Sequence, residues 1–179
     1  MNKSKNLLNL IALVIGFGTF LYIFGIDFLL SKTTFFYHFD HPLFMTGYLA
    51  FINDTWHFPL AVTDNIYPDS NFSIVWTDSI PIFSIFLKLI YSIFGFKLLN
   101  PFPLWYLICY ILFAFFIGKI IQLKTNNIFI FTTAVFLLVN TPLMVNRMIL
   151  HSALSAHWLI IASVYFYIIN KENGYRHLN

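Results

Sequence analysis

Hydrophobic positions in this chain form long continuous runs that short polar segments separate. Four runs stand out: residues 7–30, 102–122, 128–145 and 152–170. A helix needs about 20 consecutive apolar residues to cross a hydrocarbon core of roughly 30 Å. Continuous runs also favour helices over the alternating strands of a membrane barrel. The pattern therefore predicts an all-α integral membrane protein, a single domain over residues 1–179, with about four transmembrane helices.

A fifth apolar run, residues 80–99, is interrupted by residues that disfavour a membrane span: Pro81, Lys88 and Gly95. A lysine near the centre of a span costs roughly 2.5–3.5 kcal/mol. The alternative is a helix that lies along the membrane surface. The two alternatives place the remaining basic residues on different sides of the membrane, so the charges can decide between them.

The charge distribution favours the surface helix. If residues 80–99 cross the membrane, four basic residues lie outside: Lys119, Lys124, Lys171 and Arg176. If the segment lies on the surface, these four join Lys3 and Lys5 inside, as the positive-inside rule requires. We therefore predict an interfacial helix at Ile80–Phe96, cytoplasmic termini and an outer loop over residues 31–99.

The one long polar segment, residues 33–78, holds five of the seven acidic residues: Asp40, Asp54, Asp64, Asp69 and Asp78. It is far longer than a simple connection between helices, and such loops are usually functional. Within it, Pro42–Phe51 is expected to form a short amphipathic helix, since proline suits a first helical turn. With the surface-helix topology, Arg147 and His151 emerge on the same side as this loop.

Composition limits the chemistry. The chain is 59% hydrophobic and 9% charged, its net charge is +3, and Cys109 is its single cysteine. These numbers exclude a disulfide framework and give no indication of nucleic-acid binding. The sequence holds no glycine-rich phosphate loop and no paired zinc-ligand motif. His38, Asp40 and His41 have no specific metal-ligand spacing, so we predict no metal site, although a divalent cofactor stays open.

Two acids at the ends of the polar segment are candidate catalytic residues. Asp40 follows the first predicted span, and Asp78 precedes the predicted surface helix. A carboxylate at the membrane edge loses solvation, which raises its pKa and suits a general base. Each acid also fits the role of a helix N-cap, and by pattern alone the cap is the commoner role.

Three residues near the last predicted span are candidates for binding a lipid phosphate. Arg147 has the planar fork that recognises phosphate, although an arginine here can also just set topology. His151 lies four residues later, on the same helix face. His157 joins them only if a helix starts at or after His151. Trp76 is a candidate for stacking on a sugar, with the aromatic belt as its alternative role.

Three stretches resemble an uncharacterised family of bacterial integral membrane proteins. They are Gly47–Leu60 (GYLAFINDTWHFPL), Ser73–Pro81 (SIVWTDSIP) and Arg147–Leu159 (RMILHSALSAHWL). That family in turn resembles the GT-C glycosyltransferases, which are multi-span enzymes that use polyprenyl-phosphate-linked sugars. Family members often carry Gln and His shortly after the first acid, where this chain has Leu43 and Phe44.

The resemblance implies an outer loop with membrane-surface helices and an acid that activates the acceptor hydroxyl, matched best by Asp40 and next by Asp78. It implies a polyprenyl-phosphate sugar as donor, a glycan or lipid as acceptor, and the bacterial inner membrane as location. GT-C proteins have more spans, so we expect this chain to be an N-terminal part. The alternative is a non-catalytic protein, either a transporter fragment or a subunit that supplies helices to a partner.

Overall fold

The computed structural model describes residues 2–30, 41–68 and 70–176, with side chains described for residues 4–30, 42–68, 70–146 and 151–171. Four helical stretches within these residues are long and apolar enough to cross a membrane: Ser4–Phe24, Phe102–Gln122, Ile128–Asn146 and Ala153–Lys171. The predicted all-α fold with four candidate spans is therefore confirmed. The chain is a multi-pass membrane protein.

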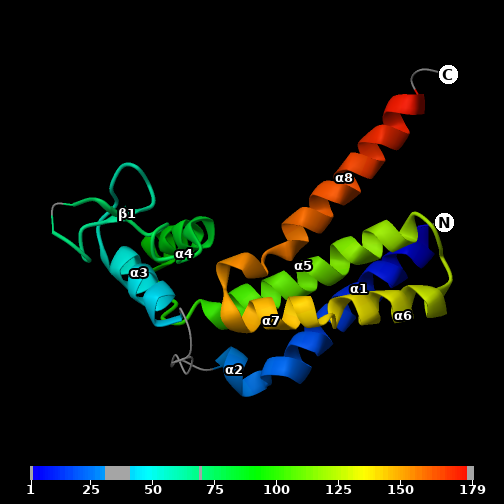
Figure 1. Cartoon of the computed structure of the whole chain (residues 1–179), viewed down its shortest axis with the longest axis horizontal. Helices are drawn as coiled ribbons and strands as arrows, with labels where there is room; N and C mark the ends of the chain where they lie inside the picture. The colour runs from blue at the N-terminus through cyan, green and yellow to red at the C-terminus, as the bar shows by residue number, and fades with distance from the viewer. Residues whose placement is uncertain (1, 31–40, 69, 177–179) are drawn as a thin grey trace.

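Helices α1 (Asn2–Phe24), α5 (Phe102–Gln122) and α6 (Ile128–Val139) form a closely packed bundle (Figure 1). Small residues bring α1 and α5 together, as is common between membrane helices. A Cβ atom at Gly16 would lie 2.7 Å from the carbonyl oxygen of Tyr110, so only glycine fits there. Helix α8 (His157–Arg176) contacts α5 near its start and then points away from the bundle.

Three helix boundaries differ from the predicted runs. The first run breaks at Gly25, whose φ of 78° ends α1 before the short helix α2 (Ile26–Leu30). The run at 128–145 is interrupted after Val139, and Pro142 opens α7 (Pro142–Leu150), the position in a helix where proline is favoured. The last run starts with a 3₁₀ turn, η1 (Ala153–Ser155), and α8 begins only at His157.

Residues 41–100 form a separate small unit at one end of the bundle, which we call the α3–α4 module. It contains α3 (His41–Asn53), a two-residue antiparallel ladder between β1 (Val62–Thr63) and β2 (Phe72–Ser73), and α4 (Pro81–Phe94). Figure 1 shows the module beyond the end of α5, on the side away from the chain's N-terminus. The short helix predicted at Pro42–Phe51 corresponds to α3.

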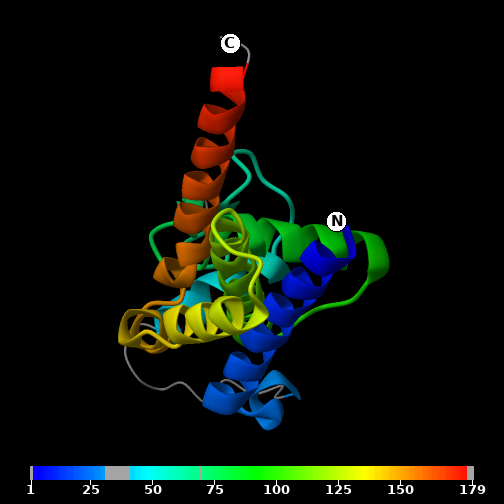
Figure 2. The same ribbon diagram turned by 90° about the vertical axis from the view of Figure 1, so that its right-hand side faces the viewer.

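Helix α4 has the properties of the predicted surface helix. Its 14 residues extend about 21 Å, which is too short for a hydrocarbon core of roughly 30 Å. The two views show that α4 runs across the direction of α5 rather than along it (Figures 1 and 2). One stripe of α4 is exposed and apolar: Ile82, Phe86, Leu89 and Ile93. The opposite stripe, with Ser84, Leu87 and Lys88, is buried in the module.

Candidate functional site

The structure describes the side chains of four of the six predicted site residues. Asp78 and Trp76 lie in the turn before α4, and His151 and His157 flank the break between α7 and α8. Arg147 lies in α7, but its side chain is outside the described part of the chain. Asp40 lies outside the described residues altogether. The geometry therefore bears on Asp78 and on the two histidines.

Asp78 occupies an unusual backbone conformation. Its φ is 53°, and Ile80, two residues later, has a φ of 51°. Positive φ is uncommon outside glycine and is a clear outlier for a β-branched residue such as isoleucine. The N-cap of α4 is Ile80, which provides no side-chain hydrogen bond to the helix. The N-cap role considered for Asp78 is therefore wrong: the aspartate lies in a strained turn ahead of the helix.

Close contact with α3 holds this turn in place. Ser79 Oγ donates a hydrogen bond to the carbonyl of Phe44 at 2.7 Å and lies 2.7 Å from Thr77 Oγ1. Thr77 Oγ1 also donates to the carbonyl of Ile74 at 3.0 Å. A Cβ at Gly47 would come within 1.9 Å of Thr77 Oγ1, so the turn can lie here only because α3 has glycine at that position. Such over-determined strain is typical of functional sites.

A second set of buried hydrogen bonds holds the break between α7 and α8. Trp105 Nε1 in α5 donates to the carbonyl of Ser152 at 2.8 Å and to Ser155 Oγ at 2.9 Å. The hydroxyl groups of Tyr106 and Ser152 are 2.7 Å apart. Because the helix restarts at His157, the condition for bringing His151 and His157 to one place is met. The ring of His157 lies 6.5 Å from that of Phe113.

The turn and the break meet along one apolar groove of about 480 Å³, which we call the tryptophan groove. Ile80 and Pro81 form one wall, directly after the Asp78 turn. Ala153 and Ala156, from the segment between His151 and His157, form another wall. The rings of Trp105 and Trp158 complete the lining. Residues next in sequence to the Asp78 turn and residues between His151 and His157 thus line the same groove, at the junction of module and bundle, while Asp78, His151 and His157 are not among its lining residues.

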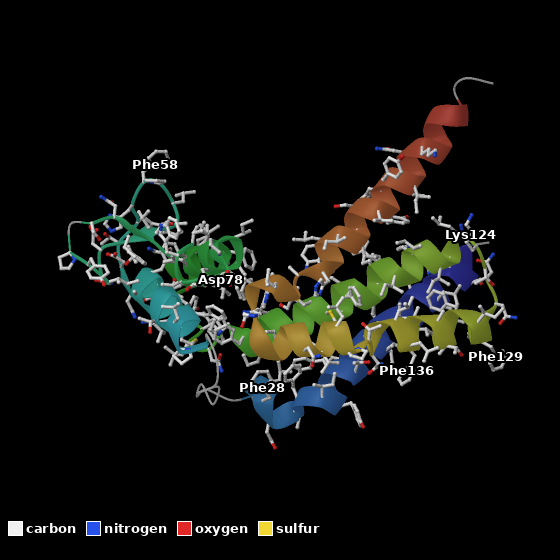
Figure 3. All side chains as sticks on the ribbon, viewed as in Figure 1. Phe28, Phe58, Asp78, Lys124, Phe129 and Phe136 are labelled. Carbon is white, nitrogen blue, oxygen red and sulfur yellow. The ribbon has the colours of Figure 1, made fainter. Side chains whose placement is uncertain are left out.

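Trp76 is not part of this arrangement. Its side chain is 79% exposed and does not line the groove. Figure 3 shows Asp78 at the side of the module that faces the bundle, and Lys124 at the far end of the bundle. Asp78 and Lys124 thus lie near opposite ends of the bundle.

Sequence reasoning missed a polar cluster inside the module, centred on Asp54. Asp54 Oδ2 accepts hydrogen bonds of 2.7 Å from Thr63 Oγ1 and from the Asp64 backbone N–H. Asp54 Oδ1 accepts from the Thr55 N–H at 2.7 Å and lies 3.2 Å from His57 Nε2. Partial burial acts to raise the pKa of this carboxyl, but the hydrogen bonds outweigh burial and lower the pKa well below its ordinary value.

Lys88, which the sequence presented only as an obstacle to a membrane span, is part of the same module. Its Nζ donates to the carbonyl of Thr55 at 2.8 Å and lies 4.0 Å from the centre of the Phe51 ring and 4.8 Å from that of Trp56. Burial lowers the pKa of the ammonium group, and the charge of Asp54 partly opposes this shift. The signal available in the sequence was the four-residue spacing of Ser84, Lys88 and Ser92, which places these three polar residues on one face of a helix.

In the part of the chain that the structure describes, no group of three histidine, cysteine or acidic side chains is placed to hold a metal ion. His57 lies between two carboxylates, 3.2 Å from Asp54 and 3.8 Å from Asp64 Oδ2. These contacts connect the loop that follows α3 to the residue after β1 and so help to organise the module.

Comparison with known proteins identifies one family. A family model described as a domain of unknown function, DUF6311, matches residues 13–178. The chain belongs to this family. The match covers the bundle, the α3–α4 module and α8 together, so all elements of the candidate site lie within the DUF6311 domain. Searches of curated proteins and of solved structures returned no match.

Proposed function

We propose that this DUF6311 protein is a membrane glycosyltransferase of the GT-C type, or the N-terminal part of one. It would transfer a sugar from a polyprenyl-phosphate donor to a glycan or lipid acceptor at the outer face of the bacterial inner membrane. The observation that supports the proposal is the tryptophan groove, because its apolar lining includes the residues that follow the Asp78 turn and residues from the segment between His151 and His157. An amphiphilic substrate needs such a combination.

The proposed roles follow from position and chemistry. Asp78 is the general base that takes the proton from the acceptor hydroxyl, because its turn lies directly beside the groove. Asp40, matched to the same role by resemblance, is the second candidate. Arg147 binds the donor phosphate through its planar guanidinium, and His151 and His157 assist at the same end of the bundle. Trp76 is retained only as a peripheral contact for a sugar ring.

The transporter form of the non-catalytic alternative predicts charged side chains along a path through the membrane, whereas the form in which the chain supplies helices to a partner makes no such prediction. In the four candidate spans, acidic and basic residues occur only in the end turns: Lys5, Lys119 and Lys171. Lys88 lies in the module, and Asp27 is exposed on α2. These positions give a transport path no support, so the glycosyltransferase is the function we put forward.

The first test is substitution of Asp78 by asparagine in the full protein, expressed in cells that lack the native copy. Asparagine tolerates positive φ, so the turn should persist. Loss of a general base is expected to reduce glycan transfer about 10²–10⁴-fold, measured as turnover of polyprenyl-phosphate-linked sugars by mass spectrometry. Asp27→Asn, an exposed change on α2, is the matched control. Transfer at the wild-type rate in Asp78→Asn would reject Asp78 as the base.

Arg147 offers a second test with a distinct signature. Arg147→Lys keeps the positive charge but loses the fork that binds phosphate through two parallel hydrogen bonds. We expect this variant to raise the KM for the donor while the KM for the acceptor stays constant. Equal effects on both substrates would show that Arg147 supports the fold and does not bind the donor phosphate.

A further inference from the structure

A second cavity, distinct from the tryptophan groove, lies where α2, α4 and α5 approach one another. Its volume is about 580 Å³, within the ~300–1,000 Å³ typical of small-ligand sites. Leu29 from α2, Leu87 and Ile90 from α4, and Leu104 from α5 supply an apolar lining. The segment between α4 and α5 closes one side with Leu98. We call this space the leucine cavity.

Among the described residues that line the leucine cavity, Lys97 is the one with a cationic side chain. Lys97 Nζ donates a hydrogen bond to Asn53 Oδ1 and lies 5.8 Å from the centre of the Tyr91 ring. An ammonium group carries three N–H donors, so two remain for a ligand. Lys88, the other lysine of the module, is 2% exposed and engaged with Thr55 and two aromatic rings. Of the two lysines in the module, Lys97 is thus the one that a ligand in the cavity can reach.

The depth of the cavity indicates which ligand it meets. Lys97 lies in the connection from α4, the surface helix, to Phe102, where the span α5 begins. That connection is at the level of the lipid headgroups if α5 crosses the membrane and α4 lies on it. Leu104 lies in the first turn of the candidate span α5, and Leu29 lies in α2, just after the candidate span Ser4–Phe24. A cation at headgroup level above an apolar space fits an anionic lipid.

We propose that the leucine cavity binds an anionic diacyl phospholipid, with its phosphate on Lys97 and an acyl chain among the leucine side chains. A zwitterionic lipid with the same chains gains less, because its own cation offsets the attraction to Lys97. This site does not depend on the glycosyltransferase proposal. A lipid bound there would lie at the junction of module and bundle and would contact both α4 and the surrounding bilayer.

The test is native mass spectrometry of the full chain in a non-ionic detergent, titrated with phosphatidylglycerol and with phosphatidylcholine that carry identical chains. We expect about fivefold tighter binding of phosphatidylglycerol, the effect of one basic residue at a membrane surface. Lys97→Gln should reduce phosphatidylglycerol binding to the phosphatidylcholine level, and Lys97→Arg should retain the preference. Lys124→Gln, an exposed change at the far end of the bundle, is the matched control.

Leu104→Trp provides an independent readout that leaves the charge in place. The larger side chain fills part of the cavity, so binding of both phospholipids should weaken together. Equal binding of the two lipids by the wild-type chain would overturn the proposal, and so would a preference that survives in Lys97→Gln. Binding of farnesyl phosphate without binding of phosphatidylglycerol would also overturn it, because the site would then select a prenyl chain.

Discussion

The bundle and the α3–α4 module are built on different physical principles. In the bundle, α1 and α5 approach closely at Gly16, and the buried residues are mainly apolar. In the module, hydrogen bonds donated by Ser79 and Thr77 and accepted by Asp54 set the path of the chain, and two non-glycine residues adopt positive φ near the bundle. A bundle held by packing can tolerate many apolar exchanges. A module held by specific polar contacts tolerates fewer exchanges, and Asp78, the proposed base, lies in the module.

This contrast predicts that the largest loss of stability comes from the contact between α3 and the Asp78 turn. The methyl group that Gly47→Ala adds would lie only 1.9 Å from Thr77 Oγ1 and 2.3 Å from Ser79 Oγ, so these two side chains would have to move. Overpacking and broken buried hydrogen bonds should together lower the free energy of unfolding by about 2–4 kcal/mol. Thermal unfolding in detergent, followed by tryptophan emission, measures the change.

Gly18 in α1 is the matched control for Gly47. No atom lies within 4 Å of the position that its Cβ would take. Gly18→Ala should therefore be neutral or raise the free energy of unfolding by up to about 1 kcal/mol, because alanine favours helix. Equal destabilisation by the two substitutions would show that the module does not rely on this close contact.

The next largest effect concerns Asp54 and depends on pH. The pKa of Asp54 is lowered in the folded state, so its ionised form stabilises the fold above about pH 4, and that contribution is lost as the pH falls through the folded-state pKa. Asp54→Asn replaces an acceptor oxygen with an NH₂ group, and losing hydrogen bonds to the charged carboxylate should cost about 1.5–3 kcal/mol at pH 7.

Unfolding midpoints measured from pH 7 down to pH 2 test this prediction. The difference between wild type and Asp54→Asn should shrink as the pH falls below about 4, since the carboxyl then binds a proton in the unfolded state while it stays ionised in the folded state down to its lower folded-state pKa. Asp27→Asn, on the exposed side of α2, should leave the pH profile unchanged. A constant difference at all pH values would mean that the charge of Asp54 contributes nothing to the module.

The smallest effect is expected in the bundle, at the start of α6. Asn127 Oδ1 accepts hydrogen bonds from the backbone N–H groups of Phe129 at 2.9 Å and Ile130 at 3.2 Å. Asn127→Ala removes this N-cap and should lower the free energy of unfolding by about 1 kcal/mol. Asn127→Ser keeps a side-chain acceptor and should retain most of the stability that Asn127→Ala loses. If Asn127→Ala lowered the free energy of unfolding more than Gly47→Ala does, the proposed contrast between a tolerant bundle and a sensitive module would be wrong.

The same contrast explains what the sequence could predict. The spans follow from run length and hydrophobicity, which act locally, so residues 102–122 were predicted with their exact limits. The breaks at Gly25 and before His157 were not predicted, because an apolar run continues through each of them. Pro142 is a local signal for the break before α7, but the prediction of residues 128–145 as one run considered only the length of the apolar stretch.

The site was less predictable because it depends on contacts between distant segments. Asp78 fitted an N-cap pattern, but Gly47 and Ser79 place it in a strained turn, and only the folded chain brings these residues together. Lys88 finds its partner in the carbonyl of Thr55, 33 residues away along the chain. The approach of the Asp78 turn to the 151–157 break was predicted only as a consequence of the surface-helix topology. The roles of Asp40 and Arg147 stay predictions.

The central claim is that the Asp78 turn and the break between α7 and α8 lie on the same side of the membrane. Single cysteines at Val75, Leu154 and Asn126, all exposed, in a Cys109→Ser background, test it with a membrane-impermeant maleimide. In right-side-out vesicles, Val75→Cys and Leu154→Cys should be labelled and Asn126→Cys should not, with the reverse in inverted vesicles. Labelling of Leu154→Cys together with Asn126→Cys, and apart from Val75→Cys, would contradict the account.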